Sequence, residues 1–242
     1  MNDTATLTAE ARATVEALAT TGACVLPSAE LSRILDATPE DWTRFGRNWD
    51  DLLRDQYMAD GGTYRYRRYG QYDLDPQQGS LTLLPHEPYR QESRVNPLNG
   101  GVDRVFEPLT DQFTNDPLLA NILVNLGRIF RAVDGTDRWN IKLHPYRIVA
   151  GREMGQPAPE GRHQDGVTFI TTLLIHRVNV AGGESSAFTV EGDELVRGTL
   201  SSPGDLYLGD DRTTFHDVTP IHPVNAQEPA HRDVLVIAYT AR

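Results

Sequence analysis

The sequence predicts a single domain that is mostly β-structure, with flanking helices in its first half. Its 242 residues fall within the range of one barrel-type domain. With 39% hydrophobic and 24% charged residues, the composition is that of an ordinary globular protein. After Trp139, short runs rich in Ile, Val, Thr and aromatic residues are divided by Gly, Pro and Asp clusters at roughly ten-residue intervals, a pattern typical of antiparallel sheets.

Three segments of the first half are predicted to be helices. In residues 7–19 and 28–35 the apolar side chains recur at mixed spacings of three and four. The third helix begins after the N-cap Asp116, with Pro117 in the first helical position, and ends before Gly135. Its apolar residues form one stripe, so we expect this helix to pack against a sheet.

The second half is predicted to consist of strands joined by turns. The expected strands cover residues 139–150, 167–179, 186–191, 194–200, 205–209, 215–218 and 233–240. No Pro-, Gly- or Ser-rich linker divides the chain. Residues 1–138 are therefore expected to be helical and strand support for a β-barrel core in residues 139–242, within one domain.

Charge and cysteine content argue against several classes of protein. The chain has 23 basic and 34 acidic residues, a net charge of −11, which would repel a phosphate backbone, so nucleic acid is not an expected partner. Cys24 is the single cysteine, which excludes an internal disulfide framework and favours the reducing cytoplasm. We find no export signal and no apolar run of the roughly 20 residues that a membrane helix needs, so no membrane association is expected.

His163, Asp165 and His216 are the candidate metal ligands. In an extended chain His163 and Asp165, two residues apart, point to the same side. A His-x-Asp pattern alone is weak, because a second one occurs at residues 231–233. The first is favoured by the later His216 and by Arg232 at the start of the last strand. Two imidazoles and one carboxylate leave three positions of an octahedral iron(II) open for a bidentate co-substrate and dioxygen.

Arg232 is the candidate anchor for that co-substrate. A guanidinium can hold a carboxylate through a two-pronged, charge-assisted contact that a lysine cannot copy. The alternative is a solvated residue at the start of a strand. The run 234–239 is apolar at both alternating sets of positions, which favours a central strand and an enclosed Arg232.

With these residues in place, the sequence resembles the iron(II)/2-oxoglutarate-dependent dioxygenases, and among them the bacterial hydroxylases of free amino acids. The likeness spans residues 60–240 approximately and is carried by the segments 66–70, 144–147, 159–166, 179–185, 210–212 with His216, and 232–239. The resemblance implies a double-stranded β-helix core of the jelly-roll, cupin-like type. It further implies His163, Asp165 and His216 as iron(II) ligands and Arg232 as the 2-oxoglutarate anchor.

The resemblance also implies the reaction. Hydroxylation of a free aliphatic or cyclic L-amino acid at an unactivated carbon would consume dioxygen and 2-oxoglutarate and release succinate and CO₂. The expected partner is thus a small-molecule amino acid. One departure stands out: many relatives carry Ser or Thr two residues after the anchoring Arg, and this chain has Val234. A second hydrogen bond to 2-oxoglutarate must then come from another residue.

Candidate substrate contacts come from four places in the chain. Tyr64 and Arg68 belong to a basic, aromatic stretch in an acidic chain, suited to a substrate carboxylate, although an exposed strand would look the same. Arg147 could face the pocket and contact substrate or 2-oxoglutarate, or pair with an acid across the sheet. Glu160 and Asp211 could receive the substrate ammonium group, or be turn residues.

Two other functions fit the same residues. A cupin-type metal protein could use these ligands for isomerisation or hydrolysis without oxygen. A non-catalytic ligand-binding barrel would make the histidines incidental. Arg232 separates the first alternative from an oxygenase, because only the oxygenase needs a co-substrate anchor.

Overall fold

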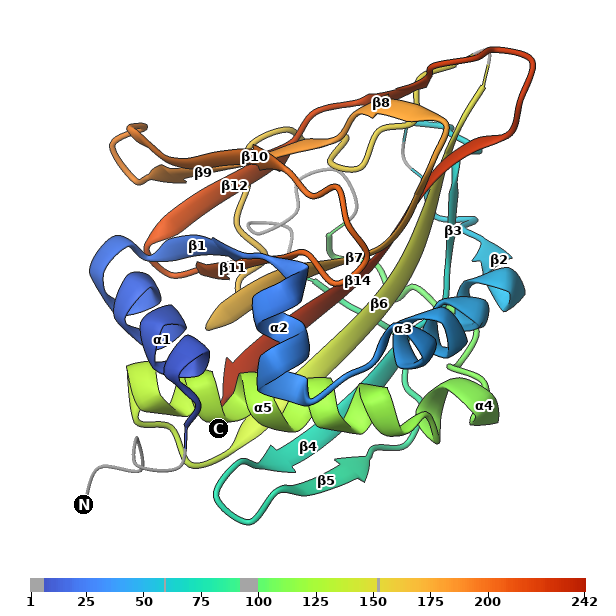
Figure 1. Ribbon diagram of the computed structural model, residues 1–242. Helices are drawn as coiled ribbons and strands as arrows, with labels where there is room; N and C mark the ends of the chain where they lie inside the picture. Colours follow the sequence, from blue (N-terminus) through green and yellow to red (C-terminus); the bar gives the residue numbers. More distant parts are fainter. Residues whose placement is uncertain (1–6, 59, 92–99, 152) are drawn as a thin grey trace.

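A group of helices from the first half of the chain covers one face of a large β-sheet in the computed structural model (Figure 1). The structure describes residues 7–58, 60–91, 100–151 and 153–242. The helices are α1 (Ala9–Thr21), α2 (Ser28–Leu35), α3 (Pro39–Gly46), the 3₁₀ helix η2 (Arg47–Asp51), α4 (Asp111–Thr114) and α5 (Pro117–Asp134). None of the helices in these ranges is long and apolar enough to cross a membrane.

The limits of α5 follow from its sequence. The Asp116 carboxylate accepts a hydrogen bond from an amide of the first turn, and Pro117 stands where no amide partner is required. Gly135 ends the helix in the left-handed conformation, with φ of 85°. The apolar stripe is buried against the sheet, where Phe130 stacks on Phe169 with ring centroids 4.4 Å apart. The helix predicted between Asp116 and Gly135 is confirmed.

The larger sheet has nine strands among the described residues and runs in the order β1-β11-β7-β14-β6-β3-β2, with β4 pairing with β6 and β5 with β4. All of these pairs are antiparallel. The strands are β1 (Ala23–Leu26), β2 (Leu53–Arg54), β3 (Arg65–Arg67), β4 (Gly70–Asp75), β5 (Ser80–Leu83), β6 (Trp139–Ala150), β7 (Phe169–Val178), β11 (Leu206–Asp210) and β14 (Ala230–Ala241).

The centre of this sheet is the long pair β6 and β14. Their register runs without interruption from Trp139 opposite Ala241 to Ala150 opposite Ala230. Side chains of alternate residues point to opposite faces of a strand. Leu143 and its partner Ile237 therefore join the core beneath the helices, and the positions between them face the other way.

Smaller sheets lie over that other face (Figure 1). One has the order β10-β9-β12, and a two-stranded sheet pairs β13 with β8. Their strands are β8 (Val180–Gly182), β9 (Glu184–Thr189), β10 (Glu194–Thr199), β12 (Thr214–Val218) and β13 (Ile221–Pro223). Two β-layers thus enclose a space between them, and helices cover the outside of the larger layer.

The strands predicted between residues 139 and 242 are confirmed, with small shifts at their ends. The last strand starts at Ala230, so Arg232 lies inside β14 and not at its edge. The sequence indicates strands before residue 139 without locating them, and β1 to β5 now prove to belong to the larger sheet. These strands have six residues or fewer, too few for a clear alternation of apolar and polar side chains.

Candidate metal centre and its cavity

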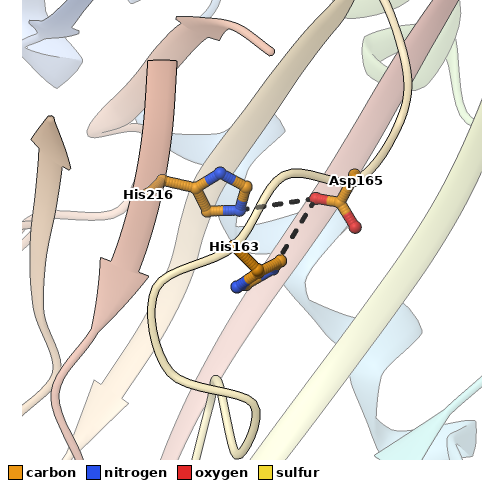
Figure 2. Close-up of side chains that lie close together, drawn as sticks. All are labelled: His163, Asp165 and His216. Atoms are coloured by element: carbon orange, nitrogen blue, oxygen red, sulfur yellow. Dashed lines mark ion pairs between the residues drawn. The ribbon is translucent and has the colours of Figure 1, made fainter. Parts of the chain in front are cut away.

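The three predicted metal ligands converge in the space between the β-layers, as Figure 2 shows. His163 and Asp165 lie in the loop between β6 and β7, and His216 lies on β12. One ligand atom of each residue lies within 4.8 Å of the other two. The Nε2 atoms of His216 and His163 are 3.4 Å and 3.9 Å from Oδ2 of Asp165.

Backbone hydrogen bonds hold the ligand-bearing loop in place. The amide of His163 donates to the carbonyl oxygen of His216 and the amide of His216 donates to that of His163, each at 3.0 Å. The carboxylate of Asp211 accepts hydrogen bonds from three consecutive amides, those of residues 165–167, at 2.7 to 3.0 Å. Asp211 is thus a positioning residue for the metal loop, and it does not line the cavity where a substrate ammonium group would lie.

The ring nitrogens of the two histidines are arranged for ligation through Nε2. Nδ1 of His163 lies 2.8 Å from the carbonyl oxygen of Gly161, so Nδ1 carries the proton and Nε2 keeps a free lone pair. Nδ1 of His216 is buried, has no hydrogen-bond partner in the part of the chain that the structure describes, and lies 3.9 Å from the Asp211 carboxylate. Asp211 therefore also lies on the side of His216 that faces away from Asp165.

The electrostatics of the triad favour an ionised carboxylate. Burial would raise the pKa of Asp165, yet the hydrogen bond from His216 and the nearby imidazoles hold it below its ordinary value. Burial likewise opposes charge on His216, but Asp165 raises the pKa of that imidazole above its ordinary value. The carboxylate therefore carries a negative charge between the two imidazoles, and this charge also suits a bound cation.

The residues present fit a divalent iron ion. Neutral imidazole nitrogens together with one carboxylate and open positions are the donor set of non-haem iron(II) oxygenases. Neighbouring ligands about 2.1 Å from one ion lie roughly 3 Å apart, and the 3.4 Å and 3.9 Å separations need only a small closure to reach this. Glu160 lies beside the centre, with Oε1 3.5 Å from Nε2 of His163.

Arg232 lines the same cavity in an unusual state for a cation. The residue is 1% exposed, and among the described residues Nε and Nη2 have no hydrogen-bond partner. Burial, assisted by the neighbouring Arg177, lowers the pKa of Arg232 to about 10. A buried cation without a partner is costly, so an anion bound in the cavity would relieve it.

The cavity beside the triad has a volume of about 290 Å³. Its wall on the larger sheet includes every second residue of the long central pair, from Lys142 to Ile148 on β6 and from Arg232 to Thr240 on β14, together with residues of β3 and β7. Every second residue lines the cavity because successive side chains of a strand point to opposite faces of the sheet. The positions between them face the helices and the outside of the sheet.

The alternation decides the place of Arg147. It lies one position from Ile148, so its side chain points to the opposite face from the cavity. There its guanidinium donates two hydrogen bonds, both 2.8 Å long, to the carboxylate of Asp233 on β14. The prediction that Arg147 faces the pocket is corrected, and its alternative, a pair with an acid across the sheet, describes the structure.

Arg68 and Tyr64 also lie away from the cavity. Arg68 donates from Nε and Nη1 to the carbonyl oxygens of Asp51 and Pro108, and the hydroxyl of Tyr64 donates to Asp60. The structure corrects the expected position of Arg68 by one residue: Arg67, on the face of β3 turned inward, lines the cavity in its place. Of the remaining predicted contacts, Glu160 lines the cavity.

Several residues of the cavity were not predicted from the sequence. Arg67, Tyr89, Arg104, Lys142 and His144 line one side of the cavity. Arg67 donates from Nη2 to Nδ1 of His144. Burial and the neighbouring Arg67 hold the pKa of His144 well below its ordinary value, so this imidazole is neutral. The alternation of residues 65–67 is the signal that could have favoured Arg67 over Arg68.

The geometry agrees with a comparison of the whole sequence with known families. Residues 46–238 match the family described as 2OG-Fe dioxygenase. The chain belongs to this family. It is therefore an oxygenase that uses iron(II), 2-oxoglutarate and dioxygen, as the sequence motifs predict.

Individual relatives of this dioxygenase support the same fold and chemistry. It is 26% identical over 201 residues to a 3(1)-hydroxy-L-isoleucine 4-dioxygenase of Pantoea ananatis, covering 80% of this chain and 78% of the relative. A crystal structure of a bsmA homologue from Methylobium petroleophilum is 36% identical, with a TM-score of 0.90 and coverage of 96% and 93%. IDO from Bacillus thuringiensis, at 18% identity, superposes with a TM-score of 0.76 and covers 96% of both chains. The predicted double-stranded β-helix is confirmed.

Proposed function

We propose that this dioxygenase hydroxylates an unactivated carbon of a free L-amino acid. The reaction converts the amino acid, 2-oxoglutarate and dioxygen into the hydroxylated amino acid, succinate and CO₂. The observation that carries the proposal is the pairing, in one cavity, of the ligand triad with the buried and unpartnered Arg232. The similarity to an amino acid dioxygenase supports the substrate class. A cytoplasmic location is part of the proposal, since the lone cysteine favours it.

Arg232 is assigned the carboxylate of 2-oxoglutarate that lies away from the metal. Its guanidinium projects from β14 into the cavity and has two nitrogens free to donate. Val234, the next inward-facing residue of β14, has no side-chain donor, so it cannot add a hydrogen bond. A second hydrogen bond to this carboxylate must come from another lining residue, and Thr172 and Thr240, which carry hydroxyl groups, line the same cavity.

His163, Asp165 and His216 would hold the iron. Iron(II) with 2-oxoglutarate and dioxygen supplies the oxidising power for inserting oxygen into a C–H bond. The protein's task is to place that bond and to exclude water. Val234 and Val236 present an apolar surface on the cavity wall, suited to the hydrocarbon part of a substrate.

Arg67 and Glu160 are assigned the two charged groups of the amino acid. Arg67 is buried, lines the cavity and has an unpartnered Nε, so it suits the α-carboxylate. Glu160 lines the cavity near His163 and suits the ammonium group. Holding both groups fixes the remaining carbons relative to the metal, which decides the carbon that reacts.

Succinate formation from 2-oxoglutarate, measured with iron(II) and a panel of free amino acids, tests this function. We expect one or a few amino acids to stimulate it and to gain one oxygen atom by mass spectrometry. The variant His216→Ala should lose iron binding and turnover while keeping its fold by circular dichroism. His222→Ala, which changes an exposed histidine on β13, is the matched control. Full activity of His216→Ala would refute the assignment of the triad.

A further inference from the structure

Three cationic side chains surround one aromatic ring in the cavity wall. The guanidinium carbons of Arg67 and Arg104 lie 5.7 Å and 4.8 Å from the ring centroid of Tyr89, and Nζ of Lys142 lies 5.6 Å from it. All four residues line the cavity. We call Arg67, Arg104 and Lys142 the cationic cluster.

Arg67 and Arg104 are buried and Lys142 is half-buried, and the described residues supply few acids to match them. Arg67 is 2% and Arg104 is 3% exposed, and Nε of each has no partner. Among the described residues, neither Arg104 nor Lys142 has a carboxylate within 4.0 Å. The one described carboxylate within this distance of Arg67 is that of Asp55, 3.7 Å away. That carboxylate is already held at 2.8 Å by Arg65, so it can neutralise one guanidinium at most.

Aromatic rings compensate the cationic cluster only in part. Arg67 lies 3.6 Å above the ring of Phe106, and Arg104 lies near Tyr89. Cation–π attraction recovers a fraction of the cost of removing a charge from water. Burial lowers the pKa of both Arg67 and Lys142, the direction expected where counter-charge is missing. The cavity is therefore complete only with an anion beside the cluster.

Lys142, at the far end of the cationic cluster, is separate from the 2-oxoglutarate anchor, whereas Arg67 lies opposite Tyr146, nearer to Arg232. Arg232 pairs with Ile148 on β6, and Lys142 lies roughly 20 Å farther along that strand at about 3.3 Å per residue. 2-Oxoglutarate cannot bridge from Arg232 to that end of the cavity while it also reaches the metal. The anion near Arg104 and Lys142 must then belong to the substrate.

A substrate with a single carboxylate would leave the cationic cluster unbalanced. Its α-carboxylate would neutralise Arg67, but its ammonium group would bring a new positive charge. Among the described lining residues the carboxylates are Glu160 and the metal ligand Asp165. Glu160 balances the ammonium group, and the charges of Arg104 and Lys142 remain.

We propose that the substrate is an acidic amino acid, whose side-chain carboxylate is held between Arg104 and Lys142. This inference rests on the proposed amino acid hydroxylation and narrows it. It departs from the aliphatic or cyclic side chain that the family resemblance implies. The methylene carbons between the two carboxylates are then the positions open to hydroxylation, beside the apolar surface of Val234 and Val236.

Matched pairs of amino acids test the proposal with the wild-type enzyme. Glutamate is compared with glutamine and aspartate with asparagine, beside isoleucine and proline, in the succinate assay. Calorimetric titration of the iron(II) and 2-oxoglutarate complex without oxygen measures binding alone. We expect an acidic member to bind and to stimulate at least about tenfold better than its amide, because a charge-assisted contact to the cluster is lost in the amide.

Lys142→Met should reduce that acid-over-amide preference at least about threefold and leave 2-oxoglutarate binding unchanged. Arg138→Gln removes a cation that pairs with Asp73 at the surface, and it should keep the preference. Preference for the amides or for isoleucine or proline, or an unaltered preference in Lys142→Met, overturns the acidic substrate while the hydroxylase function stands. If no amino acid of the panel binds or stimulates, the proposed function fails and the inference fails with it.

Discussion

Replacing Arg232 separates its role in binding from its effect on stability. Arg232→Met removes a cation that is 1% exposed and lacks partners for Nε and Nη2. Replacing a buried ion pair by apolar side chains of similar volume is often neutral or stabilising by about 1 to 4 kcal/mol in other proteins, and a buried charge without a partner is costlier still than a paired one. We therefore expect the ligand-free variant to melt at the wild-type temperature or above it, although it loses its 2-oxoglutarate anchor.

The size of the binding effect follows from the two free nitrogens. A hydrogen bond to a charged group contributes about 1.5 to 3 kcal/mol. Arg232→Lys keeps the charge and loses the two-pronged geometry, so the loss of one such bond should raise the Kd for 2-oxoglutarate roughly 10- to 150-fold. Arg232→Met should weaken 2-oxoglutarate binding by at least the same factor.

Thermal unfolding with iron(II) under anaerobic conditions measures both effects. At 2-oxoglutarate about 100 times the wild-type Kd, binding adds about 2.7 kcal/mol to stability. At about 2 to 4 °C per kcal/mol for a protein of this size, the wild-type melting temperature should rise by roughly 5 to 11 °C. The rise should shrink to about 1 to 2 °C in Arg232→Lys if binding weakens about 100-fold. Arg68→Gln, a change outside the cavity, is the control. An undiminished rise in Arg232→Met would refute the anchor.

Three further predictions concern the support of the site. Asp211→Asn removes the negative charge of the carboxylate that accepts hydrogen bonds from three amides of the metal loop. Iron affinity should therefore fall about 10- to 100-fold in anaerobic titrations. An unchanged affinity would contradict the positioning role of Asp211. Gly182→Ala should destabilise the fold more than Gly135→Ala in urea unfolding, although both glycines have positive φ. A Cβ at Gly182 would lie 2.1 Å from a backbone oxygen, whereas at Gly135 no atom of the described residues lies within 4 Å. Burial opposes ionisation of Asp233, but the hydrogen bond from Arg147 holds its pKa below the ordinary value. The stability that ionised Asp233 contributes is present above the unfolded pKa of about 3.9 and is lost as pH falls through the lower folded pKa. The difference in melting temperature between wild type and Asp233→Asn should therefore narrow as pH falls below about 4.

The metal triad was predictable because each residue type is specific to the chemistry. Imidazole and carboxylate at a two-residue spacing, followed by His216 and Arg232, leave few alternatives. The long strands and α5 were predictable for a different reason. These elements are long enough for their apolar periodicity to be clear even where single residues depart from it, and α5 also has recognisable capping residues.

The substrate side of the cavity was harder to predict because a shift of one residue reverses the face of a strand. Arg68 and Arg67 have the same side-chain chemistry, and only the pairing of Arg67 with Tyr146 shows which of them points inward. Arg104 and Lys142 come from segments that meet only in the folded chain. Their proximity depends on the path of the chain around Tyr89, which short-range patterns do not describe.

The strict alternation along β6 and β14 has a consequence for how this enzyme can diversify. Inward residues such as Lys142 and Val236 face the cavity, whereas Leu143 and Ile237 between them hold the helices to the sheet. Exchanging inward residues therefore leaves the hydrophobic layer intact. Substitutions at the inward-facing positions can therefore change the substrate specificity with little loss of folding stability. A combinatorial library confined to these positions of β6 and β14 would sample new specificities on an unaltered fold.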